Sequence, residues 1–308
     1  MKVIKFALTF VVLIMSHSLF AQGCSDAGFC TIGNLKQNPA SAKDETRQKI
    51  SLFFANGIGD ESVYVFTPGI QYDNRLSEQW DIQAKLTANY ASGNLGNAFG
   101  LGDVFIAGSF SPKTKSSWKS TITIAAKLPL NSGDLKTGNK PLPMQYQSSL
   151  GTIDGIVGYT IANQRWKFSA AFQQPFSGRN RNTFLPGYWN TVEADKYIPS
   201  NDFKRKADGL LRAGYNFNLS TRLNVTTGLL AIYHFGNDTY INANLSNAPI
   251  EIKGSSGLTL NGTAVAGFKV NRKFSIGLTA GVPFVVRDKR PDGLTREFVL
   301  SPEFILHF

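Results

Sequence analysis

Two aspartates and two histidines are the residues of this sequence best suited to catalysis. Asp103 and Asp154 each follow a glycine-containing stretch, and a pair of carboxylates on one surface could act as general acid and base. His234 and His307 lie outside the first twenty residues, and a serine hydrolase would need one of them beside a serine and an orienting group. Neither arrangement is evident here, so we expect charge balance for the aspartates, a lumen or rim position for His234, and no enzyme.

The two cysteines, Cys24 and Cys30, lie close together near the expected mature N-terminus. In an exported protein such a pair most simply forms one small disulfide loop. The alternative for Cys24 is lipidation, although Ala21-Gln22-Gly23 before it lacks the usual leucine of a lipobox. With so few cysteines and histidines we expect no metal site, and we expect no other cofactor.

The first residues predict export. Met1 to Lys5 is basic, Phe6 to Met15 is a short apolar run, and Ala21 offers a small residue for cleavage, as in a secretory signal peptide. The formal net charge is +11, but no basic run is clustered with aromatic residues. Nucleic acid is therefore not an expected partner, whereas lipopolysaccharide or an anionic solute suits the sign of the charge.

Beyond residue 47 the sequence alternates between apolar and polar residues in segment after segment. The clearest begins at Trp80 and ends at Tyr90, with apolar residues at even positions and mostly polar residues at odd positions. This period of two is typical of β-strands, and aromatic residues at both ends of a strand are typical of the two interfacial girdles of a membrane barrel. About twelve such segments can be counted, which predicts an all-β fold.

The connections between these segments alternate in length. Five of them are short, near residues 73–77, 112–116, 162–164, 219–220 and 271–272, whereas 131–149, 177–204 and 236–255 are long. Short periplasmic turns on one rim and long external loops on the other define a transmembrane antiparallel up-and-down β-barrel. A soluble β-sandwich gives no reason for loop length to follow strand parity.

The C-terminal segment supports the same fold. Phe304, Leu306 and Phe308 share one parity, and the sequence given ends on an aromatic residue. This pattern resembles the C-terminal recognition signal of bacterial outer-membrane proteins, so we expect these three residues to form an assembly signal for the barrel-assembly machinery.

Three segments are predicted: a signal peptide at 1–21, an N-terminal segment at 22–46, and an outer-membrane β-barrel at 47–308. Two interpretations of residues 22–46 stay open, a periplasmic leader or a plug inside the lumen. The apolar residues Phe29, Ile32 and Leu35 favour the plug slightly, because a solvated tail would gain nothing from them.

Residues of the opposite parity should face the interior of the barrel. A general diffusion porin would have a more polar interior. Apolar residues among the inward-facing positions therefore favour a channel for a hydrophobic or amphipathic solute. The lumen-lining candidates are Phe53, Asp81, Lys85, Asp103, Phe105, Lys119, Lys127, Asp154, Lys167, Arg212 and His234.

The stretch Gly100–Phe110, followed by Ile124–Asp134 and Gly158-Tyr159, resembles a bacterial family of outer-membrane transporters of the MetA pathway of phenol degradation, near the FadL-type channels. Leu130-Asn131-Ser132-Gly133 departs from the family pattern by an insertion. Asn38-Pro39-Ala40 is similar to a motif in the plug of FadL-type channels, and the signal peptide resembles those of Bacteroidetes. The resemblance implies import of small hydrophobic or aromatic compounds, and it identifies no substrate residues.

We therefore expect a passive channel for small hydrophobic or aromatic solutes, integral to the outer membrane of a Gram-negative bacterium and surrounded by outer-membrane lipids and lipopolysaccharide. A structural or adhesive barrel with a closed lumen is the alternative, and an outer-membrane lipid hydrolase is a third. The sequence leaves the solute and the oligomeric state open.

Overall fold

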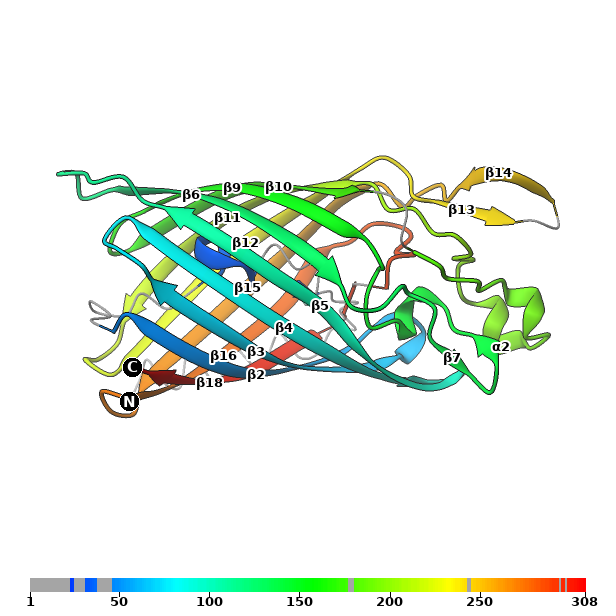
Figure 1. Cartoon of the computed structure of the whole chain (residues 1–308), viewed down its shortest axis with the longest axis horizontal. Helices are drawn as coiled ribbons and strands as arrows, with labels where there is room; N and C mark the ends of the chain where they lie inside the picture. Colours follow the sequence, from blue (N-terminus) through cyan, green and yellow to red (C-terminus); the bar gives the residue numbers. More distant parts are fainter. Residues whose placement is uncertain are drawn as a thin grey trace.

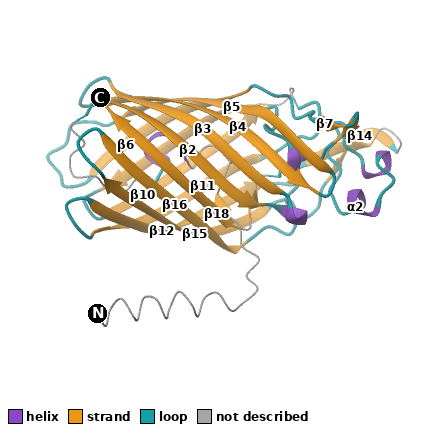
Figure 2. Ribbon diagram, turned by 90° about the horizontal axis from the view of Figure 1, so that it is seen from below, coloured by secondary structure: helices purple, strands orange, loops and turns teal. Residues whose placement is uncertain are grey.

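The computed structural model describes residues 23–24, 31–37, 46–176, 180–242, 245–293, 295–296 and 298–308. Twelve antiparallel strands form a closed barrel in which each strand pairs with the next along the chain and the last pairs with the first (Figures 1 and 2). This confirms the predicted up-and-down topology. The strands are β2 (Gln48–Ile58), β3 (Tyr64–Arg75), β4 (Trp80–Gly93), β5 (Gly96–Phe110), β6 (Lys119–Pro129), β9 (Ile153–Ala162), β10 (Trp166–Phe176), β11 (Ala207–Asn218), β12 (Leu223–Phe235), β15 (Gly257–Lys269), β16 (Phe274–Val285) and β18 (Phe298–His307).

Burial follows the two-residue period of the sequence. In β4, Gln83, Lys85 and Thr87 are buried, whereas Ile82 and Leu86 on the other parity are exposed. An apolar exterior around a closed sheet suits lipid, because hydrogen bonds between neighbouring strands pair the backbone groups and closure leaves no free edge. The barrel is thus an integral β-barrel of the outer-membrane type.

The two rims differ. The links 76–79, 111–118, 163–165, 219–222 and 270–273 lie at the end where the chain terminates, whereas the long links lie at the opposite end (Figure 1). The link between β4 and β5 is a two-residue turn, so not every link on the loop side is long. The loop side carries short elements: η3 (Asp60–Ser62), β7 (Lys136–Thr137), β8 (Lys140–Pro141), η4 (Met144–Tyr146), η5 (Pro186–Tyr188), α2 (Val192–Asp195), β13 (Thr239–Asn242), β14 (Ser246–Glu251) and β17 (Thr295–Arg296).

Two elements precede the barrel strands in the described chain. The 3-10 turn η2 (Gly33–Leu35) contacts β4, β5, β6, β9 and β10, so it lies inside the barrel. The short strand β1 (Gly23–Cys24) pairs with β17, in the link between β16 and β18. The signal peptide and Cys30 lie outside the described residues, and so does the predicted disulfide.

Among the described residues, no helix is long and apolar enough to cross a membrane.

The barrel wall contains local irregularities. The β4–β5 pairing shifts register between Leu86 and Ala88, and the β15–β16 pairing shifts between Leu260 and Asn261. At the first shift the side-chain hydroxyl of Thr87 accepts a hydrogen bond from the backbone N–H of Asp103, at 3.0 Å. Such bulges increase strand twist and re-aim side chains.

Candidate transport lumen

The N-terminal segment, residues 31–37, fills part of the lumen. Ile32 and Leu35 are fully buried and pack in one apolar cluster with Phe105 and other interior residues of the wall. The wall makes room at Gly158, where a Cβ would lie 2.7 Å from a methyl carbon of Leu35. The segment therefore lies against the strands as a packed element.

Cationic side chains of the wall hold the end of this segment. The Nζ atom of Lys167 donates to the carbonyl of Lys36 at 2.6 Å, and the guanidinium of Arg212 donates to the carbonyl of Leu35. The segment also contributes a cation, because the Nζ atom of Lys36 lies 2.8 Å from the carboxylate of Glu303 on β18. Buried, charge-assisted contacts of this kind are stronger than neutral hydrogen bonds.

A second group of contacts holds the beginning of the segment. The Nζ atom of Lys85 donates to the hydroxyl of Thr31 at 3.0 Å and lies 4.7 Å and 5.4 Å from the ring centres of Phe53 and Phe105. The backbone N–H of Gly33 donates to the Gln83 side chain at 2.8 Å. Two aromatic faces therefore contribute to stabilising the lysine.

Lys127 lies between the two aspartates considered as an acid–base pair. Its Nζ atom lies 3.0 Å from Asp154 and 4.0 Å from Asp103, and it donates to Thr152 at 3.1 Å. Asp103 also accepts a hydrogen bond from Ser149 at 2.5 Å. These contacts fit the expectation that the two aspartates balance the charge of a lysine. A buried, ion-paired carboxylate is a poor general acid.

A larger charged network occupies the loop end of the lumen. The two ring nitrogens of His234 lie 2.7 Å from Asp208 and 2.8 Å from Asp238. Arg205 lies 2.5 Å from Asp208 and 3.2 Å from Asp292. A doubly protonated imidazole can donate to both carboxylates, so the network joins β11, β12 and the three links that contain Arg205, Asp238 and Asp292.

Electrostatic interactions shift the pKa values of the network's loop residues. Burial by itself raises the pKa of Asp292, but Arg287, at 2.9 Å, and Arg205 outweigh it and hold the pKa far below its usual range. Burial likewise lowers the pKa of Arg205, but the carboxylates of Asp208 and Asp292 raise it above its usual range overall. Both groups thus stay charged at neutral pH.

The long links fold over the mouth of the barrel. Residues 142–151 are all buried, and Tyr146 from η4 packs with Phe184 and Tyr197 of the β10–β11 link. The hydroxyl groups of Tyr146 and Tyr197 lie 3.2 Å apart. Burial, together with this hydrogen bond, raises the pKa of Tyr197 above its usual range. We call residues 142–151 and the side chains packed on them the loop cap.

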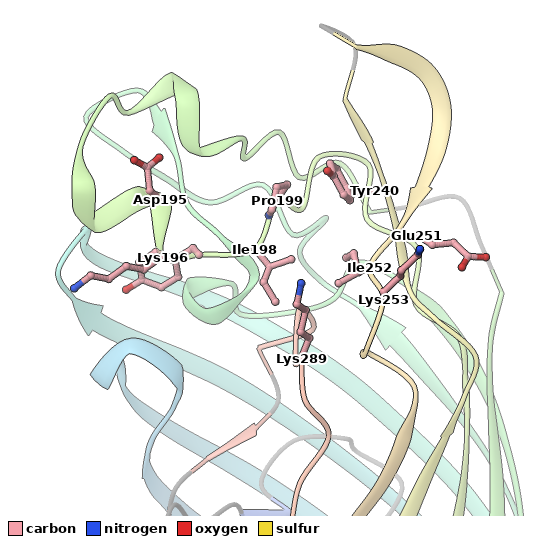
Figure 3. A pocket seen from close by; sticks show the side chains of 10 residues that line it. Asp195, Lys196, Ile198, Pro199, Tyr240, Glu251, Ile252, Lys253 and Lys289 are labelled. Carbon is pink, nitrogen blue, oxygen red and sulfur yellow. The ribbon is translucent and has the colours of Figure 1, made fainter.

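A cavity of about 520 Å³ opens among the external links (Figure 3). Its lining combines apolar side chains, such as Ile198 and Ile252, with lysines, and the amine of Lys289 points between these two residues in Figure 3. Glu251, at its edge, is hydrogen-bonded by Asn237 at 3.4 Å. The volume falls in the range of small-molecule sites.

The predicted lumen candidates fall into two groups. Asp81 and Lys119 lie at the short-turn rim, where Lys119 is exposed and Asp81 lies 3.4 Å from Arg75. The other candidates have interior positions. Lys167 is half-buried, and the rest are buried: Phe53, Lys85, Asp103, Phe105, Lys127, Asp154, Arg212 and His234.

Several interior residues were not predicted from the sequence. Glu303 and Asp208 lie on the polar parity of their strands, so the alternation could have identified them. Arg205, Asp238 and Asp292 belong to long links without periodicity. No local pattern in the sequence indicates that these three would meet His234.

The fold and the filled lumen define a membrane-spanning β-barrel with an N-terminal segment inside it. No family model matches the chain, and no curated protein matches it either. The fold is similar to that of an outer membrane channel from Pseudomonas putida F1, with a TM-score of 0.61 and 10% identity over 85% of this chain and 96% of that chain.

A second solved structure, the CymD monoaromatic hydrocarbon channel, aligns over 95% of this chain and 99% of its own at 9% identity. Its TM-score is 0.44, and so it carries no argument about function. The likeness to the Pseudomonas channel supports the fold alone.

Proposed function

We propose that this protein is a passive outer-membrane channel of a Gram-negative bacterium that admits small hydrophobic or aromatic solutes. The observation that carries the proposal is the apolar layer inside the barrel. Phe105, Ile156, Leu210 and Leu230 face inward from four different strands and are almost completely buried. A water-filled porin has a polar interior, whereas an apolar layer favours solutes that leave water readily.

The external cavity supports the same proposal. Ile198, Tyr240 and Ile252 give it an apolar surface on the side from which a solute would arrive. The sequence resemblance to transporters of the MetA pathway also favours hydrophobic or aromatic cargo.

A structural barrel with a closed lumen is the second candidate. It is favoured by the two elements that fill the interior, residues 31–37 and the loop cap, because both are buried and hydrogen-bonded. The two candidates differ in whether these elements move.

A lipid hydrolase that uses His234 as its base is disfavoured by the surroundings of this histidine. Each ring nitrogen is within hydrogen-bond distance of a carboxylate. A hydrolase of the Ser-His type needs one ring nitrogen for the serine hydroxyl, and here both nitrogens already have partners.

The test is uptake of a small radiolabelled aromatic alcohol by a porin-deficient Gram-negative host that expresses the protein. We expect faster uptake than in the host alone. Leu210→Gln, in the apolar layer, should slow uptake of the aromatic solute more than uptake of a sugar of similar size. Leu211→Gln on the lipid face, where Leu211 is 64% exposed, is the matched control.

Heat-modifiable gel mobility verifies that each variant is folded. No acceleration of uptake by the folded wild-type protein would favour the closed barrel. Equal slowing of both solutes by Leu210→Gln would contradict an apolar path.

A further inference from the structure

The short-turn rim is strongly basic. The five short turns contain six basic residues and one acidic residue, Glu78. The basic residues, all exposed, are Lys113, Lys115, Arg165, Arg222, Arg272 and Lys273.

Nothing in the transport path accounts for these cations. They lie in turns outside the lumen, and the Lys113–Glu78 contact, at 3.0 Å, joins side chains that are 72% and 83% exposed. Ion pairs of this kind contribute little to stability. The cations therefore need an explanation other than the fold.

The opposite end of the barrel does not share this excess. In the link 286–293, for example, Arg287, Lys289 and Arg290 alternate with Asp288 and Asp292. Acidic residues also accompany the lysines of the link 180–206. Among the described links, the excess of basic over acidic residues is thus larger on the short-turn rim than at the loop end.

The cations form an incomplete ring. Four neighbouring short turns, which join eight of the twelve strands, contribute at least one each, whereas the fifth carries Glu78, and Arg75 beside it is paired with Asp81. A single docked protein would need a patch on one side, whereas lipids surround a barrel on all sides. The distribution favours lipid as the partner.

Aromatic residues place this ring at the level of lipid headgroups. Trp118 precedes Lys119, Arg165 precedes Trp166, and the Trp166 and Tyr215 rings lie 4.8 Å apart. Tryptophan and tyrosine concentrate at membrane–water interfaces, and basic residues just beyond them attract anionic lipids.

We infer that the short-turn rim is a binding surface for the anionic headgroups of phospholipids, which it gathers in the leaflet on that side of the membrane. Net charge alone suits lipopolysaccharide or an anionic solute, but the mixed charges of the loop end give lipopolysaccharide no comparable basic ring.

The test reconstitutes the full chain in vesicles of phosphatidylcholine and phosphatidylglycerol, in which one lipid or the other carries brominated acyl chains. Bromine quenches the fluorescence of Trp80, Trp118 and Trp166 near the rim, whereas Trp189, in the external links, gives a background. We expect brominated phosphatidylglycerol to be enriched at least about twofold over phosphatidylcholine, and the enrichment to fall in high salt.

The variant that combines Lys115→Gln, Arg165→Gln, Arg222→Gln and Arg272→Gln should lose the enrichment. The matched control replaces Lys136, Lys196, Lys253 and Lys289 of the loop end with glutamine and should keep it. These side chains are exposed, so both variants should fold, and heat-modifiable mobility verifies this. Enrichment that survives high salt or the rim variant, or that is lost equally in the control, would overturn the inference.

Discussion

The two ends of the lumen are filled by different kinds of structure. On one side a segment that precedes the barrel strands, residues 31–37, packs Ile32 and Leu35 into an apolar layer. At the other end the links between strands fold inward and are joined through buried charges around His234 and Asp292.

This difference indicates which element could move. The N-terminal segment can leave without breaking the strand ladder, since its contacts are side-chain packing and a few hydrogen bonds from separate strands. The loop cap is covalently continuous with the strands at both ends of each link. We therefore expect the N-terminal segment to be the mobile plug and the loop cap to be the fixed one.

The largest expected effect comes from removing residues 22–46. If the segment is the plug, conductance in planar bilayers should rise several-fold while heat-modifiable mobility shows a folded barrel. Thiol labelling of Cys24 and Cys30 in the full-length chain, before and after reduction, tests the predicted disulfide. Unchanged conductance would show that the loop cap, and not the N-terminal segment, is the limiting barrier.

Asp292→Ala should loosen the loop cap. It leaves Arg205 and Arg287 buried without a shared carboxylate, and removing one partner of a buried ion pair costs about 3–5 kcal/mol. Hydrogen exchange of residues 142–151 should accelerate accordingly, with no change at 31–37. Asp288→Ala, at an exposed position in the same link, is the control. Equal acceleration at both places would show that the two ends are coupled.

A double-mutant cycle with Lys36→Gln and Glu303→Gln should give a coupling of about 1–3 kcal/mol for docking of the N-terminal segment. The pair is largely buried, with side chains 18% and 12% exposed, so solvent screens it weakly. Hydrogen exchange of residues 31–37 measures docking. The exposed Lys113–Glu78 pair, treated the same way, should couple by less than about 1 kcal/mol. A value this small for Lys36–Glu303 would show that this contact does not hold residues 31–37 in place.

The smallest effect on the loop cap is expected when the pH is lowered from 8 to 5. Because the pKa of Asp292 is held below its usual range, its stabilising contribution is fully present above the ordinary aspartate pKa of about 4. The contribution is lost progressively as pH falls further. The protection factors of the loop cap, which are corrected for the pH dependence of intrinsic amide exchange, should therefore be steady down to pH 5 and fall only below about pH 4. A transition between pH 8 and pH 5 would indicate that a group other than Asp292 controls the cap.

The sequence predicts the barrel well because the two-residue period is a local signal. Strand number, closure and the outward faces of segments such as Trp80–Tyr90 all follow from it. The interior parity also indicates Lys127 and His234 as inward residues. Which partners they meet depends on residues such as Asp238, whose position in a long, aperiodic link the period cannot specify.

The alternation of apolar and polar residues also gives wrong lumen positions at the ends of strands. Asp81 and Lys119 have the inward parity, but they lie one residue or less from the ends of their strands, where a side chain reaches solvent at the rim. Depth in the barrel, which parity does not encode, separates them from Lys85 and Lys127.

The contact between Lys36 and Glu303 joins residues 267 positions apart in the chain. During synthesis Lys36 is made 267 residues before Glu303. The segment therefore cannot acquire this contact until β18 is complete and placed beside β2. A truncated or unfinished chain would lack both the closing strand and the carboxylate that anchors the segment, so a stalled assembly intermediate would carry its N-terminal segment unanchored at Glu303.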